Sequence, residues 1–261
     1  MESLNPATAG RDAAPAPPVI DGPGWSGVRC FCTTREGGAG RPPFDTLNLG
    51  LRAGDDPATV HENRRRLRAL LPAEPLWLTQ VHGAGVLDAD VPNDTLEADA
   101  AVTAARGRVL AIMVADCLPV AIADARGRVL GAAHAGWRGL AAGVLERTVE
   151  RLRARCPDGD WVAWIGPGIG PTAFEVGEDV RQAFTGPDRE AAAAFAPYPG
   201  RPGKWLADLP ALAGRRLRAA GVARVQASGL CTASDPGRFF SYRRDGATGR
   251  MALLAWLEGA D

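Results

Sequence analysis

Three side chains that can bind a borderline metal ion stand in similar local contexts, although they lie far apart in the chain. His82 ends an apolar run in QVHG, Cys117 lies in ADCLP, and His134 lies in AAHAGWRG. Each is followed by a small residue, a turn or a proline, and the ends of neighbouring strands can converge in space. Two imidazoles and a thiolate can hold zinc and leave a fourth position for water or substrate. These residues therefore predict a catalytic metal centre.

The spacing of these residues is a weak signal by itself, because the chain contains neither a CxxC nor an HExxH pattern. A cysteine in an apolar run is usually a small buried hydrophobe, and a histidine near a core is often a structural residue. A metal-free site, with Cys117 as nucleophile and His134 as general base, agrees with the residues as well. The remaining histidine, His61, is expected on the exposed flank of a helix.

Two other features could serve a phosphate-containing ligand. The segment IGPGIGP resembles a dinucleotide fingerprint, but it lacks the last glycine of GxGxxG and is not followed by a clear helix, so it predicts a tight loop near the site. Arg35, Arg138 and Arg243 lie in glycine-flanked turns, where a guanidinium could bind phosphate through two hydrogen bonds. A surface role is an equally good interpretation for each of these arginines.

The elements that must position these residues are intermixed strands and helices. Helices are expected over residues 54–71, 140–155 and 208–222, the first capped by Asp56 and the last capped by Asp208 and ended at Gly221. Strands are expected over residues 28–34, 75–83, 106–124 with an interruption at Cys-Leu-Pro, 126–134, in 161–171 and at the end of 239–257. Without a regular βαβ rhythm, the pattern favours an α+β fold, a mixed sheet covered by helices.

Composition limits the classes of function. The 261 residues are 46% hydrophobic and 23% charged, and 30 basic residues balance 30 acidic ones, so nucleic acid and membrane surfaces are not expected partners. Five scattered cysteines indicate a reducing compartment, and neither a signal peptide nor a membrane span is apparent, so a cytoplasmic location is expected. Residues 1–24 are expected to form an Ala/Pro/Gly-rich disordered tail, and residues 25–261 a single catalytic domain.

The order of the motifs carries a specific resemblance. TTREGG, NLG, AGDDPATVHENRRRL, QVHG, ADCLPV, AAHAGWRGLAAGV, IGPGIG, FEVGEDV, SGLCTASDP and FFSYRRDGATGRMALLAWL follow one another from about Trp25 to Glu258. In this arrangement the chain resembles the family named variously polyphenol oxidase with a laccase domain, purine nucleoside phosphorylase, or peptidoglycan editing factor. The resemblance implies a layered α+β fold similar to cysteine-hydrolase-like toxins, and a zinc ion held by His82, Cys117 and His134.

The resemblance also implies an activity. Such proteins are credited with phosphorolysis of adenosine, guanosine, inosine and methylthioadenosine to a base and a pentose 1-phosphate, and with deamination of adenosine; some bacterial members are assigned an editing role in peptidoglycan precursor synthesis. A multicopper oxidase would need more than three histidines, so zinc is the expected cofactor and Cu²⁺ the less favoured alternative. This chain has Ala173 and Ser234 where family members often carry cysteines, which casts doubt on a redox or second-metal role there.

The sequence thus leads to one main hypothesis, a zinc-dependent purine nucleoside phosphorylase with adenosine deaminase activity, whose ligands are purine nucleosides and phosphate. The competing hypotheses are a hydrolase of a cell-wall nucleotide precursor and a non-catalytic partner protein that uses zinc for stability. Asp116 would orient a ligand or act as acid/base, or alternatively cap the local turn. The expected catalytic residues are Cys117, Asp116, His134 and Arg138, and the expected substrate- or phosphate-binding residues are Arg35, Gln80, Arg138 and Arg243.

Overall fold

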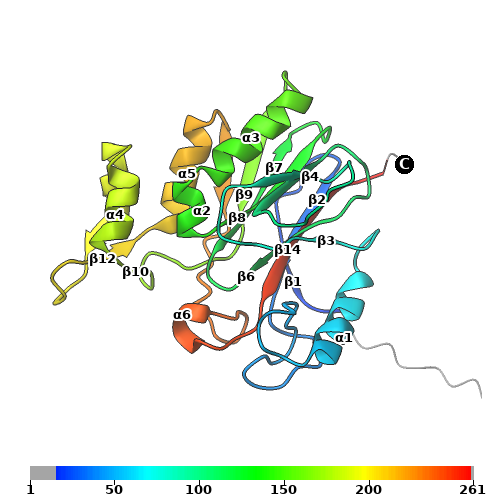
Figure 1. Cartoon of the computed structure of the whole chain (residues 1–261), viewed down its shortest axis with the longest axis horizontal. Coiled ribbons are helices and arrows are strands. Elements are labelled where there is room, and N and C mark those ends of the chain that lie inside the picture. The colour runs from blue at the N-terminus through cyan, green and yellow to red at the C-terminus, as the bar shows by residue number, and fades with distance from the viewer. Residues whose placement is uncertain (1–15, 260–261) are drawn as a thin grey trace, which may run out of the picture.

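The structure is a computed structural model that describes residues 16–259, and its centre is a pair of stacked β-sheets between two groups of helices (Figure 1). One sheet has five strands in the order β1-β2-β14-β6-β3, and the other has six in the order β13-β9-β7-β8-β5-β4. The strands of the first sheet are β1 (Val19–Asp21), β2 (Val28–Thr33), β14 (Met251–Leu257), β6 (Leu110–Val114) and β3 (Leu76–Trp77). Those of the second are β13 (Arg224–Ala227), β9 (Trp161–Ile165), β7 (Leu118–Asp124), β8 (Leu130–Ala135), β5 (Ala100–Thr103) and β4 (Val86–Asp88).

The central strands β6, β7, β8, β9 and β14 are buried on both faces, which explains why their sequences are continuous apolar runs. Successive side chains of a strand point to opposite faces. In β7, Ala121 therefore packs between the two sheets while Ile122 packs under the helices. In β14, Leu253 packs between the sheets while Leu254 packs towards α1 (Pro57–Arg68) on the outside. The result is four layers, with helices on both outer faces, and it confirms the predicted α+β class with mixed sheets.

The helix α1 forms where its sequence signals predict. Asp56 caps it by accepting hydrogen bonds from the backbone N–H groups of Ala58 and Thr59, and Pro57 opens the first turn. Val60 and Leu67 are buried, Leu67 against the five-stranded sheet, whereas His61 is exposed, as expected. On the other side of the molecule, α5 (Leu209–Ala219) begins at its predicted cap, Asp208, and is followed by Gly221 in a left-handed conformation with φ of +82°.

The helix expected over residues 140–155 is two helices, α2 (Trp137–Ala141) and α3 (Val144–Arg155). Gly143 separates them with φ of +89°, a conformation that continues neither helix. The segment that follows His134 is therefore the start of α2 rather than a plain turn. His134 itself lies inside β8.

The apolar segment 106–124 is not one interrupted strand in one sheet. It forms β6 in the five-stranded sheet and β7 in the six-stranded sheet, so the chain passes from one sheet to the other at residues 115–117. Asp116 has φ of +92° at this crossing. Pro119 lies within β7 rather than at the break, near the end of the strand, where its carbonyl still accepts a hydrogen bond from the Gly166 N–H.

Two further expectations are wrong in their boundaries. The strand expected over residues 75–83 ends at Trp77, after which the chain turns away from β6. The tail expected to reach residue 24 ends earlier, because Val19–Asp21 form β1 and pair with β2. Residues 1–15 of that tail lie outside the described residues.

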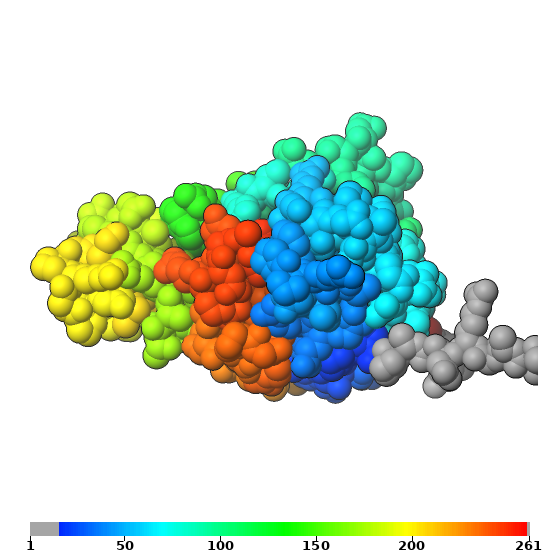
Figure 2. Space-filling view, turned by 90° about the horizontal axis from the view of Figure 1, so that it is seen from below, coloured from blue at the N-terminus to red at the C-terminus, as the bar shows by residue number. Residues whose placement is uncertain are grey.

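A small lobe extends from one end of the six-stranded sheet (Figures 1 and 2). It contains a three-stranded sheet in the order β10-β12-β11. Its elements are β10 (Glu175–Gly177), α4 (Glu178–Thr185), the 3-10 helix η1 (Arg189–Ala194), β11 (Phe195–Pro197) and β12 (Lys204–Ala207). The short helix α6 (Tyr242–Asp245) lies between this lobe and the loop after β2 in Figure 2. Within residues 16–259 no helix is long and apolar enough to cross a bilayer.

The contact of α3 with β8 is a test of this layering. Leu152 is fully buried, and a Cβ built on Gly131 of β8 would lie only 3.2 Å from Leu152 Cδ1. Leu152→Ala leaves a void in this tightly packed layer and is expected to lower the free energy of unfolding by about 2–5 kcal/mol, measured by urea denaturation. The control Leu96→Ala, at a position that is 41% exposed, is expected to change it by less than about 0.5 kcal/mol.

Candidate metal centre and its cavity

The fold brings together the three side chains that the sequence singled out. The ligand atoms of His82, Cys117 and His134 all lie within 4.8 Å of one another. Cys117 directly precedes β7, and Pro119 of β7 pairs with His134 of the antiparallel strand β8, so sheet register places the thiol beside the imidazole. His82 arrives from the loop after β3, and its ring stands at 75° to that of His134 with the centroids 4.8 Å apart.

One buried carboxylate, that of Asp99, positions both histidines. Asp99 accepts hydrogen bonds from the backbone N–H groups of Val81, His82 and Gly83 at 2.7–3.2 Å. The same carboxylate lies 2.8 Å from His134 Nδ1. The loop wraps around Asp99 closely enough that His82 adopts a left-handed backbone conformation, with φ of +61°. An imidazole held through Nδ1 presents Nε2 to the site.

The electrostatics of the cluster favour a thiolate. Burial alone would keep Cys117 neutral, but the charge of His134 and hydrogen bonds from His134 and His82 outweigh it and lower the pKa of Cys117 to about 6. Burial likewise disfavours a charge on His134, but Cys117 and Asp99 outweigh it and raise the pKa of His134 to about 9. The two groups stabilise each other's charged forms.

The donor set fits a zinc ion. Zinc is commonly bound by imidazole nitrogen and thiolate sulfur, and a set of three protein ligands is typical of its catalytic sites. The contact of Asp99 with the outer nitrogen of His134 is the kind of supporting hydrogen bond that metal-binding histidines usually make. His82, Cys117 and His134 would hold such an ion.

Asp116, next to the thiol, is engaged through both carboxylate oxygens. One accepts from the Thr232 hydroxyl at 2.6 Å and the other from the Arg243 backbone N–H at 2.6 Å. Asp116 thereby ties the sheet crossing at Cys117 to the segment that precedes β14. Both oxygens are thus engaged by groups of the protein, a contact pattern that agrees with the turn-stabilising alternative.

The glycine-rich segment 166–170 packs directly behind Cys117, as the expected tight loop. A Cβ on Gly168 would lie 2.5 Å from Leu118 Cδ2 and 3.1 Å from the Asp116 carbonyl oxygen, so only glycine allows this approach. The loop is held to the crossing by a hydrogen bond from the Ile169 N–H to the Asp116 carbonyl oxygen at 2.8 Å.

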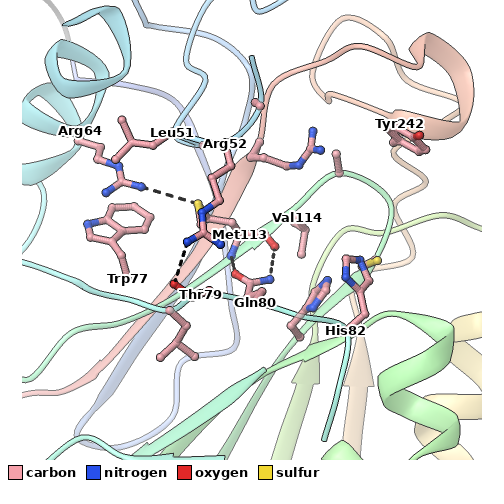
Figure 3. A pocket seen from close by; sticks show the side chains of 17 residues that line it. Leu51, Arg52, Arg64, Trp77, Thr79, Gln80, His82, Met113, Val114 and Tyr242 are labelled. Carbon is pink, nitrogen blue, oxygen red and sulfur yellow. Dashed lines mark hydrogen bonds between the residues drawn. The ribbon is translucent and has the colours of Figure 1, made fainter. Parts of the chain in front are cut away.

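A cavity of about 620 Å³ opens in front of the cluster (Figure 3). Within the described part of the chain its lining contains no aspartate or glutamate, and its permanently charged side chains are all arginines. The lining residues are Gly50, Leu51, Arg52, Ala53, Arg64, Trp77, Leu78, Thr79, Gln80, His82, Met113, Val114, Ala115, Cys117, His134, Tyr242 and Arg250. Such a lining favours an anionic or oxyanion-containing ligand.

The other residues expected in the site are placed differently. Gln80 lines the cavity, but its amide exchanges two 2.8 Å hydrogen bonds with the backbone of Met113, continuing the pairing with β6 after β3 has ended. Arg35 is absent from the lining and binds the Asp45 and Pro236 carbonyl oxygens. Arg138 is exposed and stacks on Trp137.

Arg243 also lies outside the cavity lining, although Tyr242 beside it belongs to that lining. Its guanidinium donates to the Glu175 carbonyl oxygen at 2.8 Å and covers the ring of Phe174. The structure therefore brings the three expected metal ligands together, places Gln80 beside them, and leaves the three expected arginines at other positions.

Four residues around the cluster were not identified from the sequence: Asp99, Arg52, Arg64 and Arg250. Asp99 precedes a short strand in EADAAV with no motif that marks it. Arg250 ends the loop before β14, where the TGR of the resemblance motif offered a signal. Arg52 and Arg64 belong to the loop before α1 and to α1 itself, where arginine at a helix surface gives no distinguishing pattern.

The positioning role of Asp99 gives a stability prediction. Asp99→Ala would leave three backbone N–H groups and His134 Nδ1 without their acceptor, and is expected to lower the free energy of unfolding by about 3–5 kcal/mol, measured by urea denaturation. Asp94→Ala, at an exposed aspartate of the same segment, is the matched control and should stay within about 0.5 kcal/mol of the parent protein. Equal stabilities of the two variants would contradict the role given to Asp99.

Comparisons with known proteins agree with this architecture. A family model described as multi-copper polyphenol oxidoreductase laccase matches residues 29–258. The chain is 51% identical over 238 residues to the Pseudomonas aeruginosa purine nucleoside phosphorylase PA4543, covering 91% of this chain and 97% of that protein. It is 48% identical over 241 residues to the Escherichia coli purine nucleoside phosphorylase YfiH, covering 90% and 97%.

Solved structures share the fold. The crystal structure of the Neisseria meningitidis protein NMB0706 matches with a TM-score of 0.86 and 43% identity, covering 94% of this chain and 100% of that chain. The Bacillus licheniformis hypothetical protein YfiH matches with a TM-score of 0.81 and 29% identity, covering 88% and 93%. The family expected from the order of the motifs is thus confirmed, and the chain belongs to the family described as multi-copper polyphenol oxidoreductase laccase.

Proposed function

We propose that the protein is a zinc-dependent purine nucleoside phosphorylase. The observation that carries this proposal is the cavity that joins the His82–Cys117–His134 cluster to a lining whose fixed charges are all positive. A phosphate-dependent reaction needs cations for its anionic co-substrate and groups that stabilise charge developing on a ligand oxygen. The names of the relatives from Pseudomonas aeruginosa and Escherichia coli support the same activity.

The reaction joins phosphate to the sugar as the base leaves. The bond between the anomeric carbon and the purine nitrogen breaks, a phosphate oxygen bonds to that carbon, and the nitrogen takes up a proton, which gives a base and a pentose 1-phosphate. Adenosine, guanosine, inosine and methylthioadenosine are the proposed substrates. The same site would exchange the amino group of adenosine for the oxygen of water, releasing ammonia and inosine.

The chain's own residues divide this work. His82, Cys117 and His134 hold the zinc ion, which when bound supplies Lewis acidity to a ligand oxygen. Asp99 holds the imidazole of His134 and the backbone segment that carries His82. Arg250 takes the phosphate-binding role that the sequence had suggested for Arg35, Arg138 or Arg243, because it lines the cavity near Cys117 and Asp116.

Arg250 is suited to an anion. Burial lowers the pKa of this guanidinium, and the nearby Cys117, Asp116 and Tyr242 only partly oppose that effect. Its Nη1 donates to the carbonyl oxygens of Thr248 and Gly249, which fixes the plane of the group. A partly buried, oriented guanidinium is a favourable partner for phosphate.

Metal-replete protein incubated with adenosine is expected to give adenine and ribose 1-phosphate only when phosphate is present. Without phosphate it is expected to give inosine. The products are identified by chromatography. Cys117→Ala is expected to lose zinc by elemental analysis and to lose both activities by about a hundredfold or more, since a Lewis acid contributes several kcal/mol to such a reaction.

Cys231→Ala is the control, because Cys231 lies outside the cavity lining and the metal cluster, and it should retain zinc and both activities. Circular dichroism checks that both variants fold. Absence of both products from the zinc-loaded parent protein would refute the proposed activity, and unfolding of Cys117→Ala alone would favour a purely structural metal.

A further inference from the structure

The cavity has two ends, of which the proposed reaction uses one. His82 of the metal cluster lies at one side of the cavity in Figure 3, and Arg64, Trp77 and Thr79 lie at the other side, with Arg52 beside Met113. The reaction at the metal end gives no role to this second group of cations. Their surroundings show what they could bind.

Arg64 is held in place by contacts that leave its outer nitrogens free of oxygen acceptors. Its Nε donates to the Leu49 carbonyl oxygen at 3.0 Å, and its guanidinium stacks 3.9 Å from the Trp77 ring centroid. The contact recorded for its outer nitrogens in the described structure is Nη2 to Met113 Sδ at 3.9 Å, and sulfur is a weak acceptor. The guanidinium of Arg64 is therefore held in one orientation, while its outer N–H donors lack a strong acceptor among the described residues.

Arg52 reaches the same part of the cavity from the loop before α1. It is exposed, and its Nη2 makes one long contact of 3.5 Å with the Thr79 hydroxyl. Figure 3 shows the Arg64 guanidinium beside Trp77 and directed at Met113, and the Arg52 guanidinium directed at Thr79. Among residues 16–259, neither arginine forms a salt bridge with a carboxylate.

The protein does not neutralise this end of the cavity by other means. Glu74 acts on Arg64 only through its charge, since it is absent from the lining and accepts a hydrogen bond from Trp77 Nε1. Burial lowers the pKa of Arg64. The two guanidinium groups line one cavity and keep donors that no carboxylate of the described residues fills, so both are able to donate to an anionic group of a ligand there.

We propose that Arg52 and Arg64 form a second oxyanion subsite, which binds an anionic group covalently attached to the ligand that occupies the metal end. The preferred ligand is then a nucleoside that carries a phosphate ester or a similar anionic extension, rather than a nucleoside alone. This ligand class rests on the proposed function for its nucleoside part, whereas the anionic part rests on the two arginines.

The test compares adenosine, adenosine 5′-monophosphate and inorganic phosphate as ligands of the metal-replete full-length protein by isothermal titration calorimetry. The monophosphate is expected to bind about tenfold to a hundredfold more tightly than adenosine, as charge-assisted hydrogen bonds imply. Arg52→Gln and Arg64→Gln are each expected to lose about tenfold more affinity for the monophosphate than for adenosine.

Arg151→Gln, at an exposed arginine of α3 outside the cavity, is the matched control and should bind all three ligands like the parent protein. Arg64→Lys keeps the positive charge but lacks the two-pronged guanidinium, and it replaces Arg64→Gln if that variant does not fold. It should lose part of the preference for the monophosphate over adenosine. Arg52 is exposed and makes one weak contact, so Arg52→Gln keeps the test available in any case.

Equal affinities of the parent protein for adenosine and its monophosphate would overturn the proposal. So would variants whose only defect is a raised KM for inorganic phosphate in adenosine phosphorolysis, because that result assigns both arginines to the co-substrate. A parent protein that binds the monophosphate more tightly but performs no phosphorolysis would refute the proposed reaction and leave the second subsite standing.

Discussion

The site depends on the carboxylate of Asp99. It gathers three consecutive backbone N–H groups of the loop that carries His82, and it lies against the outer nitrogen of His134. A buried carboxylate is costly unless its oxygens are filled with donors, and here they are filled by the two chain segments that must meet. The hydrogen bonds that stabilise the buried charge therefore also hold the backbone of His82 and the imidazole of His134. Cys117 is positioned without Asp99: the register of β7 with β8 brings it beside His134, and the crossing that precedes β7 sets its place at the sheet edge.

The second constraint is the passage of the chain between two sheets. β6 and β7 are separated by residues 115–117, and the backbone at Asp116 takes a conformation that residues other than glycine rarely adopt. The crossing is held by hydrogen bonds from Thr232 and the Arg243 backbone to the Asp116 carboxylate, and by the Ile169 N–H to its carbonyl oxygen. A strained turn braced from two sides places the thiol at the edge of both sheets, where the cavity begins.

Much of this was predictable from the sequence, and the exceptions have physical causes. Local signals found α1 and its Asp56 cap, the end of α5, and the three ligand candidates, because each depends on a few neighbouring residues. The assignment of β6 and β7 to different sheets was not predictable, since both read as buried apolar runs. Asp99 was missed because its importance comes from partners up to 35 residues away.

The arginines are a second case in which local sequence did not predict the residues that line the cavity. Arg35 and Arg138 lie in glycine-rich turns, which suggested a ligand role, but their guanidinium groups contact Asp45 and Trp137. Arg64 lies in an ordinary helical sequence and Arg250 at the end of the TGR motif, and both line the cavity. Which arginine faces a ligand is decided by the packing of loops around β14 and α1, and no single stretch of sequence contains that information.

The position of β14 has a consequence for how the molecule is made. This strand, the last in the described part of the chain, lies between β2, one of the first, and β6. During synthesis on the ribosome, the edges of β2 and β6 that pair with β14 therefore remain unpaired until β14 has emerged. The apolar face of β2 also remains uncovered until then. The central position in this sheet is thus filled by a strand that follows β2 by more than 200 residues, so the sheet cannot form by pairing neighbouring segments of the chain alone.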